Sequence, residues 1–154
     1  MSDNPDWVFY HEDKMTEAEI MPRLVAEFPE FRPRWEKHLS IWKGEPAGGY
    51  NDISEFAQFV VKELYPSGKT EEIQRAFDLM EQWLVDGNQK VRELVVIGFL
   101  EDVQNIASWQ PFGRAVFIPF LRPQSGAAWN EIERVWAGKT SLMDVVREEG
   151  KTPR

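Results

Sequence analysis

The sequence predicts an all-α protein, a single-domain bundle of about six to eight helices around a central buried helix at residues 88–108. Residues 94–100, LVVIGFL, are apolar in every direction around a helix, so this helix has to be covered on all sides. The run is too short to cross a bilayer, so the cover must be protein. Apolar residues recur at helical spacing along most of the chain, and Pro, Gly, Asn, Ser and Thr separate these stretches. A length of 154 residues is typical of one domain.

Residues 1–15 are expected to be an extended lead-in, residues 16–150 one α-helical domain, and residues 151–154 a frayed tail. The lead-in carries three aromatic residues, which we expect to dock onto the domain: Trp7, Phe9 and Tyr10. Its acidic start lacks the apolar core of a signal peptide. The chain has no cysteine, as is common in reducing compartments. We therefore expect a cytoplasmic protein.

Two helices are predicted after the lead-in. Thr16 and Glu19 have the spacing of a capping box, and Pro22 predicts a break or restart of the first helix. Pro29 ends that helix, and Pro33 suits the first turn of the second. Their inward faces are predicted to carry Met21, Leu24, Val25 and Phe28, then Trp35, Leu39 and Trp42.

The third and fourth helices follow a loop at residues 44–50 and a turn at residues 66–68. Asn51 or Asp52 is expected to cap the third helix, Thr70 the fourth, and Gly87 to end the fourth. Their inward faces match the helical period. They are Ile53, Phe56, Ala57, Val60, Val61 and Leu64, then Ile73, Ala76, Phe77, Met80 and Leu84.

Asn88 is predicted to cap the central helix, and the short joint before it predicts an antiparallel hairpin with the fourth helix. Gly98 costs helix stability, so we expect it to permit a close helix contact.

Residues 111–123 are cut by prolines into short helical or extended pieces, and their VFI run could form a strand. Ser125 is expected to cap a helix that Gly138 ends, with a last short helix opening at residues 141–144. The apolar positions of the Ser125 helix are Trp129, Ile132 and Trp136.

The chain is acidic, with 26 Asp and Glu against 18 Lys and Arg and a formal net charge of −8. Such a surface repels phosphate backbones and anionic lipids, so nucleic acids and membranes are poor partners. A basic protein is a suitable partner, because complementary fields speed encounter. The alternative explanation is that the charge only keeps the protein soluble.

Motifs for catalysis or cofactor binding are weak. Gly-Lys-Thr occurs three times, but a phosphate-binding loop needs a glycine five residues before Gly-Lys, where this chain has Glu63, Glu133 and Val145. The sequence holds two histidines. His38 is expected to be packed and hydrogen-bonded, and His11 to lie in a solvated polar turn. We expect no catalytic residue, no metal and no cofactor.

Glu101 and Asp102 directly follow the apolar run. A carboxylate pair at the edge of a core is a candidate functional site. The alternative, which we favour, is that the pair marks the solvated end of the central helix.

Two stretches, VRELVVIGFLEDVQN (residues 91–105) and FLRPQSGAAWNEIERVWAG (residues 120–138), resemble the signatures of a small bacterial family of acidic helical domains with uncharacterised function. The matching positions are Val91, Glu93, Leu94, Phe99, Leu100, Glu101, Gln104 and Asn105, then Leu121, Pro123, Ser125, Trp129, Trp136 and Gly138. The resemblance spans about residues 20–140 and transfers no catalytic residue. Such proteins look like the immunity partners encoded beside bacterial toxins.

We therefore expect a cytoplasmic immunity protein, a monomer or weak dimer, that blocks a cognate and basic toxin through an acidic helical surface. Aromatic residues often anchor such interfaces. The candidate contacts are Trp42, Tyr50, Asp52, Glu55, Glu71, Glu72, Asp78, Glu101 and Asp102. Two alternatives stay open: a small metal-dependent or acid–base enzyme using Glu101, Asp102 and a histidine, and a helical scaffold that binds a peptide in a groove.

Overall fold

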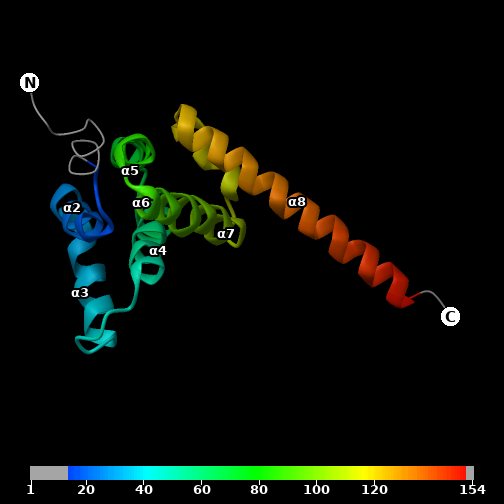
Figure 1. The fold of residues 1–154 in the computed structure, drawn as a ribbon, viewed down its shortest axis with the longest axis horizontal. Helices are drawn as coiled ribbons and strands as arrows, with labels where there is room; N and C mark the ends of the chain where they lie inside the picture. Colours follow the sequence, from blue (N-terminus) through cyan, green and yellow to red (C-terminus); the bar gives the residue numbers. More distant parts are fainter. Residues whose placement is uncertain (1–13, 152–154) are drawn as a thin grey trace, which may run out of the picture.

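The computed structural model describes the backbone of residues 14–151 and the side chains of residues 14–138. The predicted all-α class is confirmed: this part of the chain holds seven α-helices and no strand, arranged as in Figure 1. The expected docking of the lead-in aromatics and the polar turn at His11 lie outside the described residues. The elements are η1 (Glu17–Glu19), α2 (Ile20–Glu27), η2 (Pro29–Phe31), α3 (Arg32–Ile41), α4 (Gly49–Phe59), η3 (Val60–Leu64), α5 (Thr70–Asp86), α6 (Gln89–Glu93), η4 (Leu94–Glu101), α7 (Asp102–Ser108), η5 (Arg114–Phe120) and α8 (Pro123–Lys151).

The central helix is a continuous rod made of α6, η4 and α7, and its middle segment η4 has π-helical hydrogen bonding. Asn88 caps it as predicted, because its side chain accepts a hydrogen bond from the amide of Val91 at 2.9 Å. Helices α4, α5 and α8 pack against η4. Val95, Phe99 and Leu100 are fully buried there, so the rod forms the centre of the core.

One flank of this rod departs from the prediction that it would be covered on every side. Ile97 is 46% exposed, and Val96 is only partly buried. An apolar run around a helix predicts burial on average, but it does not say that neighbouring helices meet around the whole circumference. The expectation of complete cover is therefore wrong at Ile97.

Gly98 permits the close contact that the sequence predicts. A Cβ atom built at Gly98 would lie 2.3 Å from Cγ2 of Ile53 on α4, far inside ordinary carbon contact. Ile53 is itself fully buried. Helix α4 can therefore lie against η4 only because residue 98 has no side chain.

The first helix begins with the predicted capping box. The amide of Thr16 donates to Oε2 of Glu19 at 2.8 Å. The 3-10 turn η1 gives way to α2 at Ile20, so Pro22 falls in the first turn of the α-helix, where a missing N–H costs little. Helix α2 ends before Pro29, as expected.

The caps of α4 and α5 differ from the predicted ones. Helix α4 begins at Gly49, and its N-cap is Gly48, with φ +96°, a conformation that favours glycine. Asn51 and Asp52 therefore lie inside the helix. Thr70 is the first residue of α5, one position after the N-cap Lys69.

The predicted antiparallel hairpin of α5 and the rod is wrong. Figure 1 shows α5 nearly end-on while α6 and α7 run across the view, so the two cross steeply. Gly87 joins them in an extended conformation, with φ −74° and ψ 155°. The amide of Asn88 donates to the carbonyl of Met15 at 2.9 Å. Gly87 and Asn88 are both extended and form no tight turn. The chain therefore changes direction at this joint without reversing.

The C-terminal part also differs from the prediction. The VFI run lies in the 3-10 helix η5, and α8 runs unbroken from Pro123 to Lys151 through Gly138. Gly138 has no positive φ, so it lacks the left-handed conformation with which glycine ends a helix. Ser125 lies within the first turn of α8, and its amide donates to Oε1 of Glu81 at 2.8 Å. The amide of Gln124 donates to Oε2 of Glu81 at 2.9 Å, so a carboxylate of α5 caps α8.

Candidate functional site

The predicted binding residues lie on three parts of the fold. Trp42 directly follows α3, and α4 carries Tyr50, Asp52 and Glu55. Helix α5 carries Glu71, Glu72 and Asp78, and the rod carries Glu101 and Asp102. Trp42, Asp52 and Glu55 of the first group lie around one residue, His38. We define the α3–α4 face as Arg34, Trp35, His38, Leu39, Ile41, Trp42, Asp52, Glu55 and Glu63.

His38 is the centre of the α3–α4 face. It is 5% exposed, and its Nε2 lies 2.9 Å from Oδ1 of Asp52. Its Nδ1 lies 3.6 Å from Oε1 of Glu55. The imidazole stacks on Trp35, with ring centroids 5.4 Å apart. The prediction of a packed, hydrogen-bonded histidine is confirmed.

Arg34 connects the carboxylates of this face. Its Nε donates to Glu63 at 2.6 Å, and its Nη1 donates to Glu55 at 3.3 Å. Three carboxylates (Asp52, Glu55 and Glu63) against one guanidinium leave a formal charge of −2 while His38 is neutral. The acidic side chains are therefore held in fixed positions and keep a net negative charge.

Apolar side chains lie beside this network. Leu39 and Trp42, predicted to face inward, are 46% and 39% exposed, and Ile41 is 65% exposed. The inward prediction is wrong for Leu39 and Trp42, because the buried residue of α3 is His38. Two hollows flank the histidine. One of about 430 Å³ includes Trp35, Leu39, Trp42 and Asp52, and one of about 500 Å³ includes Arg34, Lys37, Ile41, Glu55 and Glu63.

Tyr50 lies outside this network. The ammonium group of Lys90 lies 4.7 Å from the centre of its ring, a cation–π contact. Lys90 belongs to α6. Tyr50 therefore joins α4 to the start of the rod, although 39% of its surface stays exposed.

The α5 carboxylates are separate from the α3–α4 face. Asp78 accepts a hydrogen bond from Nε of Arg122 at 2.7 Å, and this bond lowers the pKa of Asp78 below its ordinary value. Glu71 and Glu72 stand in the first turn of α5. The hydrogen bond between Lys69 and Glu30 raises the pKa of Lys69, and the negative charge of Glu72 raises it further.

Glu101 and Asp102 are half-buried on the rod. Burial raises the pKa of Asp102, and a hydrogen bond from Ser54 on α4 acts in the opposite direction. His38 contacts Asp52 and Glu55 instead of this pair.

Across residues 14–138, no cluster of three or more His, Asp or Glu side chains is arranged to hold a metal ion. Nor does any helix in the described part of the chain have the length and apolar character of a membrane span.

Sequence reasoning missed Arg34 and Glu63. Arg34 and His38 are four residues apart on α3, so they share a helix face. Asp52, Glu55 and Glu63 fall at intervals of three and eight residues, which also place them on one face. The sequence contains both spacings, but no residue near either of them indicates that the polar face of α3 contacts the polar face of α4 and η3.

Comparison with curated proteins and with solved structures found no match. A family model matches residues 21–137. The match runs from the second residue of α2 to the part of α8 that packs on the other helices, and it covers most of the chain. The expectation of a family without known function is confirmed. The chain belongs to the family described as Domain of unknown function (DUF7674).

Proposed function

We propose that this protein is a cytoplasmic immunity protein that binds a cognate bacterial toxin and occludes it with the α3–α4 face. The observation that carries the proposal is the combination of exposed apolar side chains with fixed carboxylates on that face. Leu39, Ile41 and Trp42 are exposed beside Asp52 and Glu55. A protein interface typically has such an apolar centre with polar groups around it.

Trp42 is the proposed anchor. A tryptophan contributes a large apolar surface and is among the residues that dominate binding energies. Its ring centroid lies 6.4 Å from that of His38, so it stands next to the paired carboxylates. A partner that covers Trp42 would therefore also meet the negative charge of the face.

The fixed carboxylates reduce the cost of binding. Asp52, Glu55 and Glu63 already have internal partners, so little side-chain freedom is left to lose when a partner arrives. The net charge of −8 would attract a basic toxin surface from a distance. Preformed contacts and long-range attraction together suit an inhibitor that must bind quickly.

The test is co-expression with the protein encoded by the neighbouring gene. We expect a purified complex and rescue of growth when that protein is toxic. Trp42→Ala should weaken the complex at least about 30-fold, the effect expected for a principal anchor. Trp109→Ala is the matched control, because Trp109 is 84% exposed and lies outside the α3–α4 face.

Two results would refute the proposal. One is the absence of both complex and rescue. The other is a complex that tolerates Trp42→Ala and loses affinity with Trp109→Ala, which would place the interface elsewhere.

A further inference from the structure

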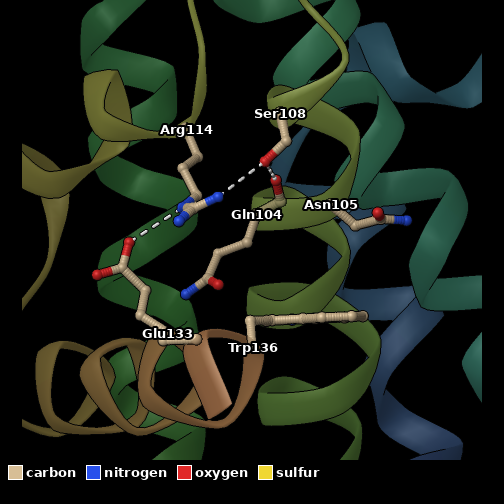
Figure 2. Close-up of a pocket in the computed structure, with 7 residues that line it drawn as sticks. Gln104, Asn105, Ser108, Arg114, Glu133 and Trp136 are labelled. Atoms are coloured by element: carbon tan, nitrogen blue, oxygen red, sulfur yellow. Dashed lines mark hydrogen bonds and ion pairs between the residues drawn. The ribbon is translucent and has the colours of Figure 1, made fainter. Parts of the chain in front are cut away.

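A third hollow, of about 470 Å³, lies between α7, η5 and α8. It is separate from the α3–α4 face, since none of its residues belongs to α3 or α4. Figure 2 shows side chains from the three elements converging on it. The hollow is lined by Gln104, Asn105, Ser108, Arg114, Glu133, Trp136 and Ala137.

Gln104 supplies an unusual feature, a buried acceptor without a partner. The residue is 2% exposed. Its Nε2 donates to the backbone carbonyl of Trp129 at 3.0 Å, which fixes the orientation of the amide. Its Oε1 has no hydrogen-bond partner. Buried amide oxygens are nearly always paired, so this atom is suited to a donor that arrives with a ligand.

Arg114, on η5, also lines the hollow. Its Nε donates to Glu133 at 3.1 Å, and its Nη1 donates to the Ser108 hydroxyl at 3.2 Å. The Ser108 hydroxyl in turn donates to the carbonyl of Gln104 at 2.6 Å. These bonds use two of the five guanidinium N–H groups, so the rest can donate to a ligand.

The charge of the hollow is balanced. Arg114 is paired with Glu133, and the other lining side chains are neutral at every pH of interest. Glu133 would repel an anionic ligand, and Arg114 would repel a cationic one. A neutral ligand suits the site best.

Donor and acceptor positions then define the ligand group. The unpaired oxygen of Gln104 requires an N–H, and Arg114 offers N–H groups to a carbonyl oxygen. One planar group that has both is a carboxamide. The indole of Trp136 also lines the hollow, and a planar group can pack against an aromatic ring.

We propose that this hollow binds a neutral planar carboxamide, with its N–H on Oε1 of Gln104 and its carbonyl oxygen on Arg114. The same chemistry has two sources, a free small amide and the side chain of an asparagine or glutamine of another protein. The proposal is independent of the α3–α4 face and stands whether or not that face binds a toxin.

The test is an NMR titration of the full-length isotope-labelled protein with benzamide, with benzoate as the control ligand that lacks the N–H. We expect saturable shifts of Gln104, Ser108 and Arg114 with benzamide and weaker binding of benzoate. Gln104→Met, which removes the acceptor and keeps the size, should weaken benzamide binding about five-fold or more. Gln110→Met is the matched control, because Gln110 lies outside the lining of the hollow.

A second arm uses glutamine with both ends blocked as a model of a partner's side chain. Binding of benzamide alone assigns the hollow to a free small amide, and binding of both ligands shows that a side chain can fill it. Ala137→Leu gives an independent check if Gln104→Met does not fold. It narrows the hollow from the exposed side of α8 and should also weaken binding. The proposal is overturned if neither ligand causes saturable shifts at the hollow, or if benzoate binds as tightly as benzamide.

Discussion

The contact between Gly98 and Ile53 gives the most direct test of the packing. A Cβ at residue 98 would lie 2.3 Å from Cγ2 of Ile53, whereas carbon atoms in contact are about 3.5–4.0 Å apart. Gly98→Ala therefore requires a shift of at least about 1.2 Å. Ile53 has no free space to move into, because it is fully buried and β-branched side chains have few allowed rotamers.

The expected magnitude follows from two opposing effects. Adding carbon to a filled core costs about 1–3 kcal/mol, and this overlap belongs at the upper end. Replacing glycine by alanine inside a helix returns about 1 kcal/mol. The net expectation is a loss of about 2 kcal/mol in the free energy of unfolding. For a chain of this size that is a fall of about 4–8 °C in Tm.

The assay is urea unfolding followed by far-UV circular dichroism, with thermal unfolding as a second measurement. Gly126→Ala is the control, because the nearest atom to a Cβ there is Leu121 Cβ at 3.9 Å. We expect that variant to be as stable as the wild type or slightly more stable. Ile53→Ala should cost about 2–5 kcal/mol by itself.

The double variant Gly98→Ala/Ile53→Ala separates overlap from other causes. Removing Cγ2 of Ile53 leaves room for the new methyl group, so the double variant should be no less stable than Ile53→Ala alone. The two changes would then be strongly coupled. Equal stability of Gly98→Ala and wild type, or additive effects in the double variant, would refute the close-contact argument.

Three further predictions concern one helix cap and two carboxylates. Asn88→Ala removes the bond to the Val91 amide and should cost about 1 kcal/mol by urea unfolding, whereas an unchanged midpoint would deny this cap any role. Burial raises the pKa of Asp102 above its ordinary value of 3.8, so its folded state holds the proton more tightly and its contribution to stability falls as pH rises above that value. The stability of Asp102→Asn relative to wild type should therefore increase between pH 3 and pH 7. Asp78 has a lowered pKa because of Arg122, so its contribution is present above the ordinary value and lost as pH falls. Asp78→Asn should show the opposite trend, and parallel pH profiles for the two variants would contradict both assignments.

Periodicity predicted the buried faces of α4 and α5 well. The apolar stripe that begins at Ile53 on α4 and ends at Leu64 on η3 is buried throughout, and so are Ile73, Ala76, Phe77 and Met80 on α5. These positions depend on local spacing, which the sequence states directly. The steep crossing of α5 and the rod cannot be read from local spacing. It depends on the extended joint at Gly87 and on the hydrogen bonds between this joint and Met15.

The failures at Ile97, Trp42 and Gly138 have a common physical cause. Each expectation used the chemistry of one segment to predict how other segments would cover or end it. An apolar side chain is buried only where a neighbour lies, and a glycine ends a helix only where the chain turns. The α3–α4 network shows the same limit, since Arg34 and Glu63 are 29 positions apart and meet only in the folded chain.

The internal ion pairs change how the acidic surface can act. Asp52, Glu55 and Asp78 were expected to pair with a basic toxin, yet each already has a positively charged or imidazole partner. Replacing these bonds with bonds to a toxin would gain little, because each carboxylate would exchange one charged or imidazole partner for another. The net charge still acts at a distance, where it speeds encounter with a basic partner more than it strengthens the complex. In the proposed complex, the strength of binding would then come from apolar burial, which on the α3–α4 face centres on Trp42 and Ile41.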